Sequence, residues 1–169
     1  GPEQFFGITG DPDLHIEASD GFPLLHRVSD GDILLPDIRR LKTAVIIPET
    51  LNPSLRRAIK SFVLSCAARL LRGQSESHNS MLIHVSHYVN AQQQIFDYVE
   101  IELEKIRNII NNADSNHFVW KELEEIWNKE YVPTSKYFTD RNLIKASVHE
   151  WEMVKPCIKP AVERMIVNQ

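Results

Sequence analysis

The feature that most constrains the fold is an unbroken helical pattern of apolar residues between Asn52 and Gly73. Apolar side chains recur there every three or four residues, which places them on one face of a helix. Asn52 suits the N-cap, Pro53 suits the first helical position, and Gly73 suits the left-handed residue that ends a helix. The apolar positions are Leu55, Ala58, Ile59, Phe62, Val63, Cys66, Ala67, Leu70 and Leu71. This stretch predicts an amphipathic helix that buries one face.

The opposite face of this helix carries basic side chains. Arg56, Arg57 and Lys60 lie in its first half, and Arg69 and Arg72 lie in its last turn. A solvated face is the ordinary interpretation of the first three, although such a face could also meet phosphate. Cations in a last turn offset the helix dipole, and Arg69 and Arg72 also flank a polar loop. These two arginines are therefore the stronger anion-binding candidates.

The polar loop covers residues 74–80, and the short apolar run 81–86 (MLIHVS) follows it. A run of this length and composition favours a strand of a parallel sheet that is covered on both faces. In open α/β sheets, ligand-binding groups collect beyond the carboxyl ends of the strands. His87, Tyr88 and Asn90 follow that end of the run. The pattern predicts a polar rim there.

The histidines of this region are weak metal candidates. His84 lies within the apolar run and is more simply explained as a hydrogen-bonded core residue. His78, His84 and His87 have no carboxylate or thiol beside them at ligand spacing. We therefore expect no metal site.

Further elements are predicted on both sides of this region. Residues 43–47 (TAVII) form a β-branched run closed by Pro48, which favours a buried strand. A second helix should begin at the Asn90 cap and end at residues 111–114. Its apolar stripe contains Ile95, Val99, Leu103, Ile106 and Ile110, with Phe96 and Ile109 beside it.

In the remaining chain, the prolines determine where we expect helices to end. A third helix should begin near Ser115 and stop before Pro133, and a fourth should be capped by Thr139 or Asp140. Its inward residues are Leu143, Ile144, Val148 and Trp151. Pro156 and Pro160 are expected to break the helical pattern. Residues 161–167 then alternate in a way that permits a strand.

The N-terminal 43 residues are rich in glycine, proline and aspartate, which predicts loops with one or two short strands or turns. We expect this segment to pack on a domain that covers residues 44–169. Its acidic cluster, Asp30, Asp32 and Asp37, could hold a divalent cation, but an exposed loop is the more ordinary explanation. The abrupt end at Asn168 and Gln169 suggests a fragment of a larger protein.

Composition narrows the class of protein. The chain has 169 residues, 43% of them apolar, which suits a single domain with a sizeable core. A net charge of −4 argues against nucleic-acid binding over the whole surface but permits a local basic face. No apolar run approaches the ~20 residues of a membrane span, and no signal peptide is visible. We expect a cytoplasmic protein without membrane contacts, in which Cys66 and Cys157 stay reduced.

Several catalytic signatures are missing from the sequence. No phosphate-binding GxxxxGK[ST] loop, GxGxxG motif or GxSxG motif occurs. The common nuclease pattern places an acidic residue two positions before a lysine, and none of the lysines has one. The chain thus shows no complete active site, and we assign no catalytic residue.

The segment from the first helix to residue 95 resembles the Z1 domain, a family of proposed endonucleases in bacterial conflict systems. The resemblance depends on RLLRGQ at residues 69–74, on His78, and on SMLIHVS at residues 80–86. It is strongest over residues 50–100 and continues to the closing VERMIVNQ. In that family the domain accompanies a superfamily-two helicase motor.

The resemblance implies that residues 80–86 form the opening strand of a RecA-like lobe, which the helices of residues 90–155 elaborate. The expected fold is therefore α/β and helix-dominated, with four main helices. A short, mainly parallel sheet would contain strands near 43–47 and 81–86 and a third candidate at 161–167.

The expected function is a nucleic-acid-processing domain of a helicase-linked endonuclease in a bacterial restriction or phage-defence system. This part of the chain would supply scaffold and DNA contacts and no cofactor site, while ATP and Mg²⁺ would serve the parent protein. The expected partners are DNA and a helicase motor in the same polypeptide. The candidate DNA-binding residues are Arg69, Arg72, Gln74, His78, Ser80, Ser86 and His87.

Two alternatives stay open at this point. In the first, the helices form a protein-interaction module that presents Trp120, Trp127 and Trp151 to a partner. In the second, the chain belongs to a metal-dependent nuclease whose site, with His78 or His84, is completed by residues elsewhere.

Overall fold

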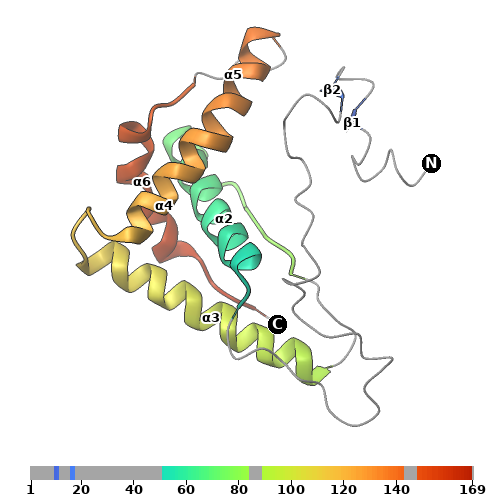
Figure 1. Cartoon of the computed structure of the whole chain (residues 1–169), viewed down its shortest axis with the longest axis vertical. Coiled ribbons are helices and arrows are strands. Elements are labelled where there is room, and N and C mark those ends of the chain that lie inside the picture. The colour runs from blue at the N-terminus through green and yellow to red at the C-terminus, as the bar shows by residue number, and fades with distance from the viewer. Residues whose placement is uncertain (1–9, 12–15, 18–50, 84–88, 143–147, 169) are drawn as a thin grey trace. The chain divides into compact units, whose positions relative to one another are not determined.

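A computed structural model describes residues 10–11, 16–17, 51–83, 89–142 and 148–168 (Figure 1). The chain divides into two compact units, residues 1–30 and 31–169. The described part of the first unit consists of two antiparallel strands, β1 (Gly10–Asp11) and β2 (Ile16–Glu17). The remainder of the N-terminal segment, with the acidic cluster at Asp30, Asp32 and Asp37, lies outside the described residues. The predicted boundary near residue 43 stays a prediction.

Helix α2 (Pro53–Leu71) is the predicted amphipathic helix, which the structure confirms at both ends. The backbone of Asn52 is extended, and its side-chain oxygen accepts a hydrogen bond from the Leu55 N–H at 2.7 Å. Pro53 follows at a position where its missing N–H breaks no helical bond. Val63 and Ala67 of the predicted apolar face are fully buried, and so is Leu64, which the predicted pattern did not include.

Gly73 ends α2 in the left-handed conformation, with φ at +72°. The Gly73 N–H donates to the Leu70 carbonyl at 3.0 Å, and the Gln74 N–H donates to the Arg69 carbonyl at 2.9 Å. These two bonds form a Schellman motif, which satisfies carbonyls that the helix leaves without partners. The motif turns the chain sharply from α2 into the polar loop.

Replacing Gly73 with alanine should lower the free energy of unfolding by about 1 kcal/mol, because a Cβ disfavours positive φ. A Cβ built at this position meets no atom within 4 Å, so the cost is conformational and not steric. Urea denaturation followed by circular dichroism would measure the change. Gly73→Asn is the matched control and should cost less, since asparagine enters the left-handed region more readily. An alanine variant as stable as the parent would contradict this account.

Helix α3 (Val89–Asn112) begins one residue before the predicted cap at Asn90. All five residues of its predicted apolar stripe are buried, which confirms the stripe: Ile95, Val99, Leu103, Ile106 and Ile110. None of the helices that the structure describes combines the length and apolarity required to cross a membrane.

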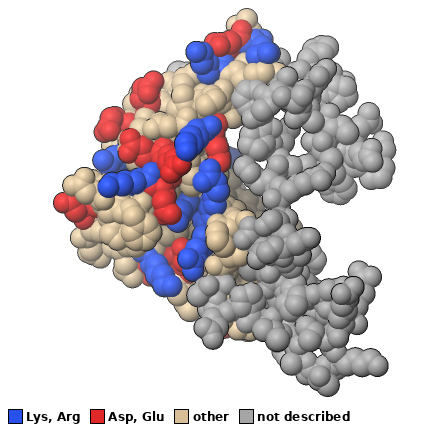
Figure 2. Space-filling model, viewed as in Figure 1, with Lys and Arg blue, Asp and Glu red and all other residues tan. Residues whose placement is uncertain are grey.

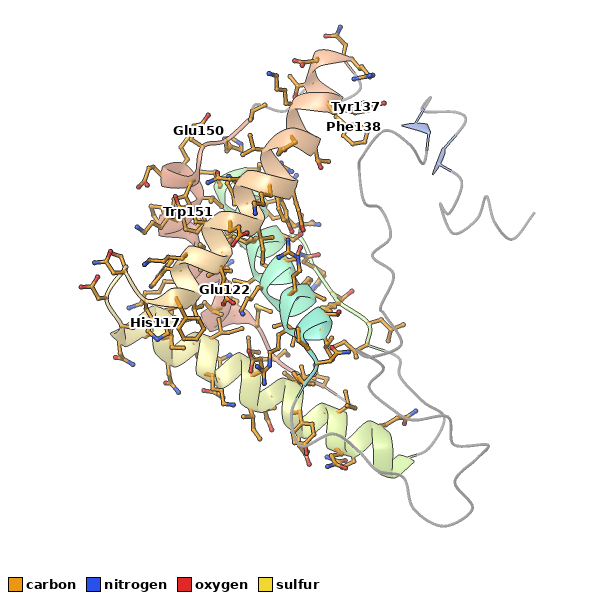
Figure 3. The ribbon with its side chains drawn as sticks, in the orientation of Figure 1. His117, Glu122, Tyr137, Phe138, Glu150 and Trp151 are labelled. Carbon is orange, nitrogen blue, oxygen red and sulfur yellow. The ribbon has the colours of Figure 1, made fainter. Side chains whose placement is uncertain are left out.

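Helix α4 (Phe118–Ile126), the π-helical turn η3 (Trp127–Tyr131) and α5 (Val132–Asp140) follow one another without a break. His117, labelled in Figure 3, is the N-cap of α4, and its ring nitrogen accepts a hydrogen bond from the Val119 N–H at 3.3 Å. The prediction that the helix stops before Pro133 is wrong. In η3 the Val132 N–H reaches back five residues to the Trp127 carbonyl. This wider turn makes room directly before the proline ring, which would clash with a preceding carbonyl in a regular α-helix.

The predicted cap of a fourth helix at Thr139 or Asp140 is also wrong, because both residues lie in the last turn of α5. The Thr139 hydroxyl instead donates to the Ser135 carbonyl within the helix, at 2.8 Å. Leu143 and Ile144, the inward residues predicted to follow, lie outside the described residues.

Helix α6 (Trp151–Arg164) contains both prolines that were expected to break the helical pattern, so that expectation is wrong. Pro156 and Pro160 are exposed and lie four residues apart, hence on the same side of the helix. Water can therefore bind the carbonyls that lose a helical donor there. The opposite side is buried at Trp151, Val154, Ile158, Ala161 and Val162. The free energy gained by burying that side exceeds the free-energy cost of the two prolines inside the helix.

The buried faces of α2, α3, α4 and α6 meet in one core, and α2 and α6 lie side by side within it (Figure 1). Leu64, Leu123 and Ile158 are completely buried at the centre. The three tryptophans also belong to this core, with exposed fractions of 9% at Trp120, 2% at Trp127 and 5% at Trp151. They stabilise the domain from inside.

The predicted α/β fold with a short parallel sheet is wrong. Residues 81–83 form no strand, and residues 161–164 complete α6, after which 165–168 are irregular. The candidate strand at 43–47 and the rest of 81–86 lie outside the described residues. Within the ranges that the structure describes, the second unit is helical, so part of a RecA-like lobe with a helical elaboration is not supported. Short apolar runs have no periodicity that separates a strand from a buried helix or an extended segment.

Candidate functional site

A pocket of about 850 Å³ lies beside the loop that follows α2. One face of α2 and one face of α3 form two of its walls. The α2 wall contains Ile59, Phe62, Cys66, Arg69 and Leu70, and the α3 wall contains Gln92, Ile95, Phe96, Val99 and Leu103. Both sets recur at helical spacing, so each helix presents a continuous strip to the same space.

The end of α6 and the residues after it form a third wall, which Arg107 of α3 holds in place. The Arg107 guanidinium donates to the Val162 carbonyl at 3.3 Å and to the Met165 carbonyl at 2.9 Å, and it also pairs with Glu104. These bonds tie the irregular segment to α3. The wall consists of Ala161, Arg164, Met165, Ile166, Val167 and Asn168.

The loop after α2 adds most of the polar groups of the pocket and is bonded to two of its walls. The Asn79 side-chain amide donates to the Cys66 sulfur of α2 at 3.3 Å. The Arg164 guanidinium of α6 donates to the Ser75 carbonyl at 3.3 Å. The loop residues that line the pocket are Gln74, Ser75, Ser77, His78, Asn79, Ser80, Met81, Leu82 and Ile83.

The charges inside the pocket are cationic. Arg69 and Arg164 line it, and its described lining contains no aspartate or glutamate. Burial raises the pKa of the Cys66 thiol, and this effect exceeds the opposite effects of the Asn79 hydrogen bond and the Arg69 charge. The thiol therefore stays protonated at neutral pH, which makes it a poor nucleophile. The arrangement suits binding an anion better than covalent chemistry.

Arg69 has an unmet hydrogen-bonding requirement. Its Nε is buried and has no hydrogen-bond partner in the part of the chain that the structure describes. A buried donor without a partner is costly, so such a group commonly marks a place where a water, ion or ligand belongs.

The basic residues in the first half of α2 do not contribute to this pocket, because neighbouring helices supply carboxylates to each of them. Arg57 lies 2.6 Å from Glu130 and Lys60 lies 2.7 Å from Glu122, while Arg56 pairs more loosely with Glu102 at 3.8 Å. Figure 2 shows basic and acidic side chains intermingled on the visible face. These cations therefore link helices, and the hypothesis that they meet phosphate loses its basis.

The structure brings together four of the seven predicted DNA-binding residues. Arg69, Gln74, His78 and Ser80 line the pocket. Arg72 is exposed at the C-cap of α2 and is not part of the lining. Ser86 and His87 lie outside the described residues, as does His84.

Among the pocket residues that the sequence analysis did not identify, three are important for the chemistry of the site: Phe62, Phe96 and Arg164. Phe62 matched the core pattern of α2, and Arg164 fell within a supposed strand. Phe96 offered the only signal, because it lies beside the α3 stripe and not within it. Among the described residues, no three His, Cys, Asp or Glu side chains lie close enough together to hold a metal ion.

Comparison with known proteins identifies the family. No curated protein and no solved structure matches the chain significantly. The family model for the Z1 domain matches residues 54–169, which is more than half of the chain. The match includes α2, α3, α4, α5 and α6, and therefore every wall of the pocket. The chain belongs to the Z1 domain family.

Proposed function

We propose that this domain contacts nucleic acid through the loop side of the pocket, as part of a DNA-processing protein. The observation that carries the proposal is the meeting of Arg69 and Arg164 with amide, hydroxyl and imidazole groups at one place. Arginine binds phosphate through charge-assisted and often bidentate hydrogen bonds. Polar uncharged side chains commonly complete such contacts to the nucleic-acid backbone.

The distribution of charge supports a local contact. The chain carries a net charge of −4, so its surface as a whole does not attract DNA. The cations in the first half of α2 are paired with carboxylates, as described above. Arg69, Arg72 and Arg164 remain around the loop, where Arg164 is bonded to the Ser75 carbonyl. Binding of this kind should weaken steeply as salt is added.

Binding is favoured over cleavage as the role of this pocket. Magnesium sites are built mainly from carboxylate oxygens and water, and no carboxylate lines the pocket in the described residues. We therefore propose that the domain supplies scaffold and DNA contacts. A helicase motor in the same polypeptide, using ATP and Mg²⁺, would supply the mechanical work. The setting proposed is cytoplasmic, in a restriction or phage-defence system.

The alternative of a protein-interaction module built on the tryptophans has lost its support. All three indole rings are at least nine-tenths buried in the core, so they offer no surface to a partner. The nuclease alternative depends in part on His84, which lies outside the described residues.

Titration of fluorescently labelled DNA at several salt concentrations tests the proposal. The parent should bind at low salt, and its affinity should fall with added salt. Arg69→Gln and Arg72→Gln should each weaken binding by about three- to tenfold and reduce the slope of log affinity against log salt by about one. Lys121→Gln is the matched control, because Lys121 is an exposed cation on α4 away from the pocket. An affinity that ignores salt, or no binding at low salt, would refute the proposal.

A further inference from the structure

Two aromatic rings line the pocket without belonging to the core. Phe62 comes from the α2 wall and Phe96 from the α3 wall, and both are only partly buried. Among the described residues, neither belongs to the core cluster or to the partly buried residues packed against it. Leu82 and Ile166, which line the same pocket, have exposed fractions of 91% and 78%. Within the part of the chain that the structure describes, the pocket therefore offers apolar and aromatic surface that the core does not use.

Amide groups stand beside this aromatic surface. Gln74, Asn79 and Asn168 line the pocket. Asn79 uses its amide N–H on the Cys66 sulfur, which leaves its carbonyl oxygen as an acceptor. Amide side chains match the donor and acceptor edges of nucleobases, and aromatic rings stack on nucleobase faces. A purely apolar ligand would leave the buried Nε of Arg69 without a partner among the described residues.

We propose that the pocket takes an unpaired nucleobase of a single-stranded nucleic acid. The base contacts both the Phe62 and the Phe96 ring, and Arg69 binds the adjoining phosphate. A volume of about 850 Å³ is ample for a base with its sugar. A duplex cannot offer the same contact, because its bases are stacked and paired. This inference rests on the proposed function and adds to it the class of nucleic acid that is bound.

The test compares three labelled DNAs of equal length: a single strand, the same strand without bases, and a duplex. A length of about 12 nucleotides covers the usual site size of single-strand binders. The parent should prefer the strand with bases over the strand without bases by about tenfold, since stacking on one aromatic ring commonly contributes that much. Phe62→Leu and Phe96→Leu should each lose most of this preference. Their affinity for the duplex and for the strand without bases should stay within about twofold of the parent, as these strands make no stacking contact.

Two control variants separate stacking from structural damage. Phe118→Leu makes the same substitution at a ring that is 61% exposed on α4 and outside the pocket, and it should bind like the parent. Phe62→Tyr keeps the aromatic face and should retain the preference for bases. Circular dichroism identifies any variant that fails to fold, in which case the other leucine variant decides the result.

The outcomes distinguish the inference from the proposed function. If the parent binds all three DNAs in a salt-dependent manner without preferring bases, the inference fails and the proposed function stands. The inference also fails if both leucine variants fold and keep the preference. If no DNA binds at low salt, both fail.

Discussion

Replacing Trp127 with alanine should lower the free energy of unfolding by about 4 kcal/mol, the largest effect we expect from a single substitution in this domain. Trp127 is 2% exposed, and its ring stacks on Tyr131 with the ring centroids 4.9 Å apart. Its indole N–H donates to the His149 carbonyl at 3.0 Å. Truncation leaves a cavity, removes the stack, and leaves a carbonyl without its donor. The effect should be large because Trp127 is also the first residue of the π turn.

Urea denaturation of Trp127→Ala measures this effect. Two control variants show how much of the loss comes from the ring, from the hydrogen bond and from burial. Trp127→Phe keeps an aromatic ring against Tyr131 but loses the donor, so it should cost about half as much. Phe118→Ala truncates an aromatic residue that is 61% exposed, and it should change stability by only about 0.5 kcal/mol. If Trp127→Ala unfolds at nearly the same urea concentration as the parent, the π turn does not depend on this ring.

Replacing Glu122 with glutamine should lower the free energy of unfolding by about 2 kcal/mol, because it leaves Lys60 buried without an opposite charge. Lys60 is 7% exposed, and its Nζ lies 2.7 Å from a carboxylate oxygen of Glu122. Glu122 points from α4 towards α2 (Figure 3). Its side chain remains 45% exposed, which keeps the loss below the 3–5 kcal/mol typical of fully buried pairs.

The complementary substitution separates pairing from burial. Lys60→Met should be nearly neutral, because an apolar side chain of similar shape needs no partner. The double variant Lys60→Met/Glu122→Gln should be more stable than Glu122→Gln alone. Glu125→Gln, which removes the exposed partner of Lys129, should leave the urea midpoint unchanged. A double variant as unstable as Glu122→Gln would mean that Lys60 is not the source of the loss.

The elements that local sequence could predict were those with local causes. The cap at Asn52, the proline at the first position and the left-handed Gly73 each act within one helical turn, and α2 begins and ends as they predict. The apolar stripe of α3 could also be predicted, because its buried residues recur with the period of a helix over many residues.

The elements that were mispredicted depend on packing between distant segments. Pro156 and Pro160 are tolerated because the other side of α6 is buried against the core. Pro133 is tolerated because the preceding turn widens, with Trp127 anchored to His149. The supposed strand at 81–86 rested on the length and composition of the run, and the one at 161–167 rested on a short alternation. Neither signal separates a strand from a helical or irregular segment over so few residues.

The sequence by itself determined the family, the ends of α2, the stripe of α3, and four of the residues that line the pocket. Only the tertiary structure decided that Arg56, Arg57 and Lys60 pair with carboxylates, and that Phe62 and Phe96 line a pocket. Caps and periodicity follow from interactions within a helical turn, so a sequence displays them. The partner of a cation and the neighbour of a ring depend on which helices pack together, and residues far apart in the chain decide that.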